Sequence, residues 1–149
     1  MPLADAAATE AAGRALGARL QGGELIHLSG GLGAGKTTFT RGLVAGLGGD
    51  ANEVASPTYT YLHAYRSGRR VVHHADLYRL RGIADDLGLD EFLQDGGVLV
   101  VEWPEHCPDL GVAPIRVLLC HDGTAGDRRT LRLPAQFSEP AGAAGIIPR

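Results

Sequence analysis

Cysteine and long hydrophobic runs are scarce in this chain of 149 residues. The two cysteines, Cys107 and Cys120, form no C-x-x-C pair. This argues against a disulfide scaffold and suits a reducing compartment, where both are most simply small buried apolar side chains. The alanine-rich N-terminus carries Asp5, Glu10, Arg14 and Arg19, which excludes a signal peptide or a membrane span at this end. We therefore expect a cytoplasmic protein without membrane contact.

An excess of positive charge is also lacking. The formal net charge of -3 and the sequence pI near 6.0 provide no broad attraction for nucleic acid. A free-standing RNA-binding protein is therefore disfavoured, and any RNA contact has to be local or to come through a partner. Among the 14 basic residues, Lys36 is the one lysine. Its compact ammonium on a flexible stem suits phosphate oxygens.

The length and the hydrophobic content of 44% predict one domain over residues 1–149 with a full core. Residues 134–149, "PAQFSEPAGAAGIIPR", read as a frayed tail.

The order of elements predicts the fold class. We expect a helix over 4–20, with Ala7, Ala11, Ala15 and Ala18 on one face, then a strand at 24–30 and a helix from Lys36. A strand hairpin over 58–76 and a helical segment at 83–93 follow. The chain continues with an apolar strand at 96–103 and a second hairpin over 114–133. The run "GGVLVVEW" is apolar apart from Glu102, as in a central strand covered on both faces. The chain is thus predicted to be an α/β, P-loop NTPase-like mixed β-sheet flanked by helices, in a single compact domain.

The stretch "GGLGAGKTT" fills the pattern G-x-x-x-x-G-K-[ST] between a predicted strand and a predicted helix. In that context the glycines let backbone N–H groups surround a phosphate, and the helix N-terminus adds its positive dipole end. Lys36 then reaches the β- and γ-phosphate oxygens, and the Thr37 hydroxyl is a hard ligand for Mg²⁺. The alternative is a glycine-rich turn from strand to helix.

Two carboxylates can complete such a site. Glu102 closes the strand "VLVVE", where a P-loop protein places the acidic group that orients Mg²⁺, and Asp76 ends "RVVHHAD" on the same strand face as His74 and Val72. We assign Glu102 to the metal and Asp76 to the attacking water. The alternatives are an ordinary strand-end charge for Glu102 and an N-cap for Asp76.

Three further features have competing interpretations. Thr58, in "SPTYT", is either a switch-like contact to the γ-phosphate or part of a turn that starts a strand. Trp103 is either core or a platform beside the site. The arginines of the "RSGRR" turn, Arg66, Arg69 and Arg70, are either solvated or a small patch for RNA or an acidic partner, whereas "HH" at 73 and 74 is interpreted as ordinary strand residues.

Four motifs stand in order, "GGLGAGKTTFTRGL", "SPTYT", "HADLYRL" and "VEWPE". This series resembles the bacterial TsaE (YjeE) family, the small ATPases of tRNA threonylcarbamoyladenosine synthesis. The match covers roughly residues 24 to 105, and "GLDEFL" is similar to the family's acidic helical segment.

The resemblance implies ATP and Mg²⁺ as cofactors, with Mg²⁺ on Thr37 and Glu102 and catalytic weight on Lys36, Thr58 and Asp76. Nucleotide-binding residues are expected at Leu32, Gly33, Ala34, Gly35, Lys36, Thr37 and Thr38, with Arg128 of "GDRR", which resembles a family Gly-Arg element, approaching the nucleotide. It also implies that the protein acts with the TsaB–TsaD pair, which modifies the adenosine next to the anticodon, so that tRNA is met through this complex. Hydrolysis is expected to be weak alone and stimulated by the partners.

Two other functions fit a P-loop. A small-metabolite kinase is the alternative, although no arginine-bearing lid stands out among the dispersed arginines. A GTPase-like switch is disfavoured because the chain has no N-K-x-D element and no glycine two residues after Leu77.

Overall fold

The structure of the chain is a computed structural model that describes residues 1–31, 33–54, 62–66, 70–80, 82–121 and 128–138. Leu32 and the whole of "SPTYT", including Thr58, lie outside the described residues.

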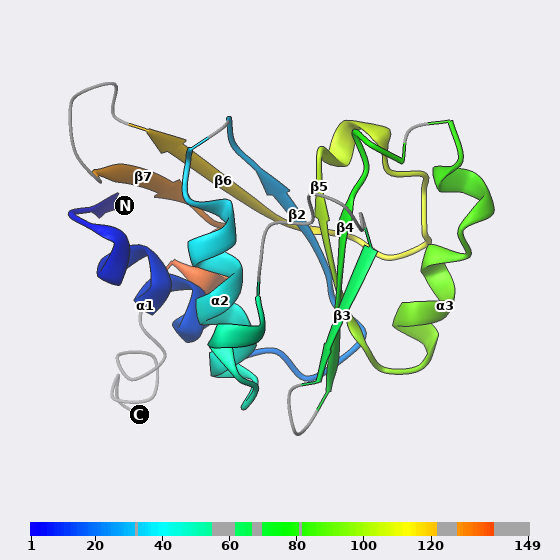
Figure 1. Cartoon of the computed structure of the whole chain (residues 1–149), viewed down its shortest axis with the longest axis horizontal. Coiled ribbons are helices and arrows are strands. Elements are labelled where there is room, and N and C mark those ends of the chain that lie inside the picture. Colours follow the sequence, from blue (N-terminus) through cyan, green and yellow to red (C-terminus); the bar gives the residue numbers. More distant parts are fainter. Residues whose placement is uncertain (32, 55–61, 67–69, 81, 122–127, 139–149) are drawn as a thin grey trace.

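A mixed sheet forms the centre of the molecule (Figure 1). Its strands are β1 (Pro2–Leu3), β2 (Leu25–Ser29), β3 (Leu62–Arg66), β4 (Val71–Asp76), β5 (Val98–Glu102), β6 (Ile115–His121) and β7 (Arg129–Arg132), in the order β1-β7-β6-β2-β5-β4-β3. The central four strands, β6, β2, β5 and β4, are parallel to one another, and β1, β3 and β7 join in antiparallel pairs. Because parallel strands end at the same edge, the ends of β2, β4 and β5 lie together.

Helices cover the two sheet faces unequally (Figure 1). Helices α1 (Ala6–Gly17) and α2 (Lys36–Gly46) pack on one face over the larger core, and α3 (Leu89–Gln94) packs against the other face over a smaller core. Short 3-10 turns lie at Ala51–Glu53, Ala84–Asp86, Pro104–His106 and Ala135–Phe137. All five residues of β5 are buried, as its apolar sequence predicts. The predicted α/β mixed sheet flanked by helices is confirmed.

Glycines bring α1 and α2 into close contact. A Cβ built on Gly13 lies 2.1 Å from the Phe39 carbonyl oxygen, and one on Gly42 lies 1.9 Å from the Glu10 carbonyl oxygen. Gly17 and Gly46 make equally close approaches one turn later on each helix. A row of glycines on each helix thus lets the two backbones touch. The predicted alanine face of the first helix is exposed, and Thr9, Gly13, Leu16 and Gly17 form the buried face.

The ends of the chain differ from the sequence-based expectation in two respects. Pro2 and Leu3 form a strand at the sheet edge, pairing with β7, which the helical pattern of the N-terminus had not indicated. Residues 134–138, expected to be frayed, include a 3-10 turn, and Phe137 packs against the larger core with Arg19 over its ring. In the described ranges, no helix is both long and apolar enough to cross a bilayer.

The helix contact generates a stability prediction. Gly13→Ala or Gly42→Ala adds a methyl group where another backbone already lies, so the helices must separate, at a cost of about 1–3 kcal/mol each. Gly31→Ala serves as the control because a Cβ there meets nothing within 4 Å. Urea unfolding of the three variants measures this. A loss for Gly13→Ala no larger than that for Gly31→Ala contradicts the close contact.

Candidate nucleotide site

The phosphate-binding motif lies between the end of β2 and the start of α2. Gly33 and Gly35 adopt left-handed backbone conformations, with φ of 75° and 98°, which non-glycine residues rarely adopt. Gly35 is also the N-cap of α2, whose first residue is Lys36. The loop therefore turns directly into a helix N-terminus, the geometry that favours an anion.

The strand register places the two predicted carboxylates beside this loop. In the sheet, Glu102 of β5 pairs with Leu28 of β2 on one side and with Asp76 of β4 on the other. All three strands run parallel, so Asp76 and Glu102 end neighbouring strands at the edge where the phosphate loop begins.

The ammonium of Lys36 is the centre of the site. Its Nζ donates to the Gly30 carbonyl oxygen at 2.7 Å and lies 3.4 Å from Glu102 Oε1. It also lies 5.3 Å from the centroid of the Trp103 ring, within cation–π range. Lys36 thus joins the start of the loop to the carboxylate assigned to the metal.

His74 is a residue that the sequence interpretation missed. Its side chain is fully buried, and its Nε2 donates to Glu102 Oε2 at 2.5 Å. The interpretation of "HH" as strand residues that face opposite sides is confirmed, since His73 stacks on Phe92 over the α3 face while His74 contacts Glu102. The signal was in the sequence, because alternation already placed His74 on the face of Asp76.

The surroundings of Glu102 decide its protonation. Burial alone raises the pKa of the Glu102 carboxyl group, but the hydrogen bond and charge of His74 and the nearby Lys36 ammonium together outweigh burial. The net result is a pKa below the ordinary value of 4.5. Glu102 is therefore held as a carboxylate, although only 8% of it is exposed.

Asp76 caps the turn that follows β4. Its Oδ1 accepts from the backbone N–H groups of Tyr78 at 3.1 Å and Arg79 at 3.4 Å. The capping role weighed in the sequence is present, and it fixes the orientation of the carboxylate beside Glu102.

Trp103 borders the site in a strained conformation. It has φ of 59° and ψ of 58°, unusual for a bulky residue and more so before a proline. Its ring contacts that of Tyr78, at 5.1 Å between centroids. Together with Ser29, Gly30, Gly31, Pro104 and Glu105 it lines a cavity of about 250 Å³ at the start of the loop. The platform interpretation of Trp103 thus agrees with its half-buried position.

An arginine from β7 reaches the phosphate loop. Nη2 of Arg129 donates to the Gly33 carbonyl oxygen at 2.8 Å. The residue singled out from the sequence, Arg128, is exposed and contributes its carbonyl oxygen to Arg129 Nη1 at 3.0 Å. Of the two arginines, Arg129 is therefore the one whose side chain contacts the loop.

The remaining residues expected in the site lie on the loop and the first turn of α2. Ala34 is buried, Gly33 is exposed, and Gly35, Thr37 and Thr38 are half-buried. Thr37 and Glu102 offer the oxygen donors that Mg²⁺ prefers. The described residues contain no group of three or more His, Cys, Asp or Glu that could hold a metal. This donor set fits an ion shared between protein oxygens and substrate phosphates.

The comparisons with known proteins agree with this geometry. The family described as "Threonylcarbamoyl adenosine biosynthesis protein TsaE" matches residues 3–130. Curated proteins named tRNA threonylcarbamoyladenosine biosynthesis protein TsaE include one from Nostoc, 39% identical over 85% of this chain and 80% of its own length. Another, from Bacillus subtilis, is 43% identical over 64% of this chain, and the match spans 60% of that relative's length. A crystal structure of Bacillus subtilis YdiB superposes with a TM-score of 0.68 at 29% identity, covering 89% of this chain and 82% of the other.

The lowered pKa of Glu102 predicts a pH-dependent contribution to stability. A carboxyl group with a lower pKa in the folded state stabilises it above the unfolded pKa, and this contribution is lost as the pH falls through the folded-state pKa. Relative to Glu102→Gln, the free energy of unfolding of the original chain should therefore drop below pH 4.5, by up to about 1.4 kcal/mol per pH unit. Urea unfolding between pH 3 and 7 measures the difference. Parallel curves for the two proteins over this range contradict the assigned electrostatics.

Proposed function

Since the chain belongs to the TsaE family, and so to the proteins of tRNA threonylcarbamoyladenosine biosynthesis, we propose that it binds and hydrolyses ATP with Mg²⁺ in this pathway. The product is the threonylcarbamoyl group on the adenosine next to the anticodon. The observation that carries the proposal is Lys36, whose Nζ lies 3.4 Å from Glu102 at the mouth of the phosphate loop. The α2 N-terminus beside it adds a second preference for phosphate.

Each residue of the loop has a role in substrate binding. The backbone N–H groups around Gly33 and Gly35 bind the phosphates, and Lys36 exchanges the Gly30 carbonyl oxygen for phosphate oxygens. Thr37 and Glu102 would hold Mg²⁺, which would supply positive charge to offset that of the phosphates. Glu102 leaves Lys36 on binding, while its second oxygen keeps the bond to His74.

Hydrolysis also requires an ordered water. Asp76 is the neighbour of Glu102 in the sheet, and its turn-capping bonds hold one carboxylate oxygen in place. We assign to Asp76 the orientation of the attacking water and to Thr58 a contact with the γ-phosphate. Leu32, Ala34, Thr38 and Arg128 complete the proposed nucleotide contacts, and Arg129 anchors the loop through Gly33.

The proposed partners are TsaB and TsaD, with tRNA met through their complex. A net charge of -3 makes independent tRNA binding unfavourable, so recognition of RNA is left to the complex. Hydrolysis by the chain alone is expected to be slow, because contact with a partner completes the arrangement of Asp76 and Thr58.

Measurement of ATP hydrolysis by the purified protein, alone and with TsaB, TsaD and tRNA, tests the proposal. We expect low turnover that rises at least about tenfold with the partners, a change of about 1.4 kcal/mol in the barrier. Lys36→Ala removes the phosphate-binding ammonium and should abolish turnover in both conditions. Turnover that ignores the partners but rises with a metabolite that becomes phosphorylated supports a kinase instead.

Asp76→Ala separates binding from chemistry. Because Asp76 is assigned to the water, the variant should bind ATP about as well as the original chain while losing about 10²-fold or more in turnover. Binding is followed by calorimetry and turnover by phosphate release. Glu102→Ala is the comparison, since it should lose the dependence of ATP affinity on Mg²⁺. Equal losses of binding and turnover in Asp76→Ala exclude the assigned role.

A further inference from the structure

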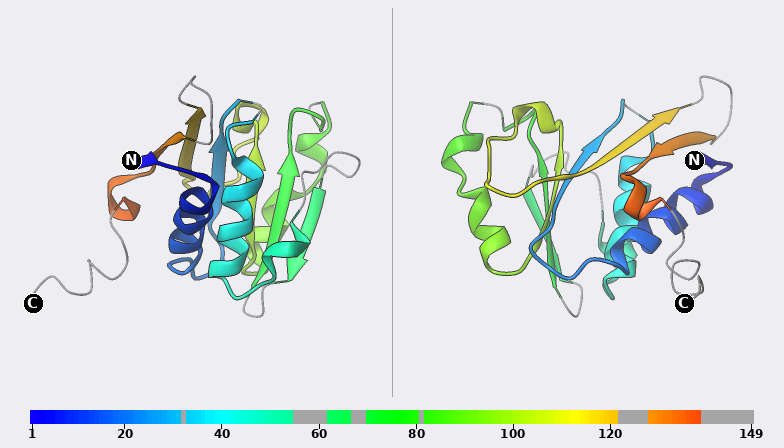
Figure 2. Two further views of the ribbon diagram at one scale, coloured as in Figure 1. Left: turned by 60° about the vertical axis from the view of Figure 1, so that its left-hand side comes forward. Right: turned by 180° about the vertical axis from the view of Figure 1, so that it is seen from behind.

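Half of one sheet face carries no helix in the part of the chain that the structure describes. Helices α1 and α2 lie on the face of Val117, Leu119 and Leu131, and α3 lies across the sheet over β5 on the opposite face. On that opposite face, Leu25 at the start of β2 packs in the smaller core with α3. The ribbon seen from behind shows no helix over β6 or the end of β2 (Figure 2).

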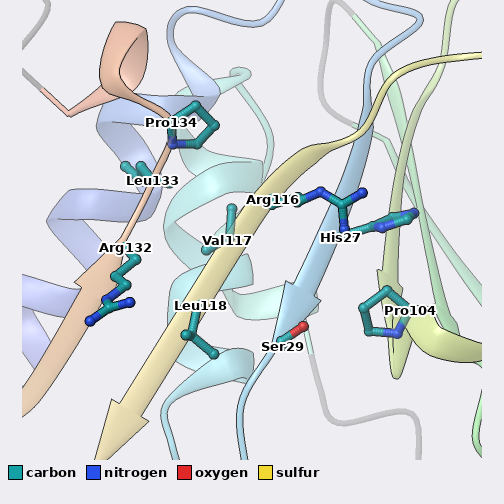
Figure 3. A pocket seen from close by; sticks show the side chains of 9 residues that line it. All are labelled: His27, Ser29, Pro104, Arg116, Val117, Leu118, Arg132, Leu133 and Pro134. Carbon is teal, nitrogen blue, oxygen red and sulfur yellow. The ribbon is translucent and has the colours of Figure 1, made fainter.

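A groove of about 460 Å³ runs over this half of the sheet. It is lined by residues of β2, β6, the end of β7 and the turn after β5, among them His27, Ser29, Pro104, Arg116, Leu118 and Arg132 (Figure 3). Leu118 and Pro104 form apolar parts of the surface, together with Leu133 and Pro134 at one end. A large apolar groove on an uncovered sheet face is typical of an interaction site.

The charge of the groove differs from that of the protein as a whole. The net charge is -3, yet the lining residues named above include two exposed arginines, Arg116 and Arg132, and no carboxylate. Within the described ranges, the ion pairs are both made by Glu102, so neither arginine has an acidic partner there.

His27 places a partly buried imidazole beside Arg116. Its Nε2 is buried and has no hydrogen-bond partner among the described residues. Burial, and to a lesser extent the neighbouring Arg116 charge, lower the pKa of His27 and favour its neutral form. The positive charge of the groove therefore comes from Arg116 and Arg132.

We propose that this groove docks an acidic segment of a partner protein, with an apolar side chain on the Leu118–Pro104 surface and carboxylates on Arg116 and Arg132. Apolar contact surrounded by complementary charge is the usual composition of such sites. Single-stranded RNA is the less suitable occupant, since its bases stack on aromatic side chains and the imidazole of His27 is the one aromatic ring among the described lining residues.

The groove is joined to the nucleotide site. Ser29 and Pro104 line both the groove and the cavity at the start of the phosphate loop. Pro104 directly follows Trp103, and the Lys36 ammonium lies over the Trp103 ring. A segment bound in the groove therefore contacts Ser29 and Pro104, which also line the cavity beside Lys36. This step rests on the proposed function, with the TsaB–TsaD pair as the partner.

Charge reversal tests the proposal. The double variant Arg116→Glu/Arg132→Glu should bind the TsaB–TsaD pair at least about tenfold more weakly, because both charge pairs become repulsive. Its ATP hydrolysis without partners should stay within about twofold of the original, since neither arginine belongs to the nucleotide site. Arg66→Glu, an exposed arginine on β3 at the opposite edge of the sheet, is the matched control and should bind as the original does. The variant Arg116→Gln/Arg132→Gln shows whether loss of the two positive charges is sufficient to weaken binding. Thermal melts of all variants confirm that they are folded.

Several outcomes overturn the proposal. Unchanged binding of TsaB–TsaD by the double variant rejects the groove while leaving the proposed function intact. An equal loss in Arg66→Glu assigns the acidic contact to the β3–β4 turn instead. Weakened binding of tRNA with unchanged protein binding makes the groove an RNA site. If the chain self-associates and the double variant abolishes this, the occupant of the groove is a second copy of the chain. If truncation after Ser138 tightens the binding of an acidic peptide, the occupant is the chain's own C-terminal segment.

A second probe keeps the two proposals distinguishable. If the original chain does not bind TsaB–TsaD, its proposed partner is wrong, and the groove is then judged by NMR titration with the peptide Glu-Leu-Asp-Leu-Glu. Saturable shifts of the Leu118 and Leu133 amides support a docking site for acidic segments. The affinity obtained from them should be at least about tenfold lower for the double variant, and lower for the peptide Lys-Leu-Lys-Leu-Lys. No shift at these amides excludes it.

Discussion

The site depends on one constraint, the parallel alignment of β2, β4 and β5, whose carboxyl ends meet at one edge of the sheet. Because of this alignment, the phosphate loop, Glu102 and Asp76 come from distant parts of the sequence and still lie together. The buried hydrogen bond between His74 and Glu102 depends on the same register, since His74 lies two residues before Asp76 on β4. A shift of β4 by one residue would turn His74 and Asp76 to the opposite face.

The rest of the fold holds this edge in place. The glycine contact between α1 and α2 fixes the position of α2, which begins at Lys36. The hydrogen bond from Arg129 of β7 to the Gly33 carbonyl oxygen fixes the phosphate loop. The left-handed backbone conformation of Trp103 lowers the stability of the fold by roughly 1–3 kcal/mol. It places the indole ring beside Lys36. Stability and site geometry are thus maintained by the same contacts.

The sequence predicted the parts of the site that have a local signature. The glycine spacing and the apolar run ending in Glu102 were sufficient for the loop, its helix and the central strand. His74 was missed because its partner lies on a neighbouring strand, and strand pairing is not visible in a single strand's pattern. Helix propensity treats Gly13, Gly17, Gly42 and Gly46 as unfavourable, so their use in a close helix contact became clear only with both helices in place. Arg128 and Arg129 are adjacent, and the register of β7 with its neighbours, β1 and β6, determines which one faces the loop.

The central claim is that Lys36, now held by Gly30, Glu102 and the Trp103 ring, is the group that binds the phosphates of ATP. Trp103 is the single tryptophan, so its fluorescence reports directly on the position of Lys36. Titration with ATP and Mg²⁺ should give a saturable change in this fluorescence, because the ammonium leaves the ring for the phosphates. The change should be absent from Lys36→Ala. An unchanged signal in the original chain, despite ATP binding measured by calorimetry, or the same signal in Lys36→Ala, would contradict the account.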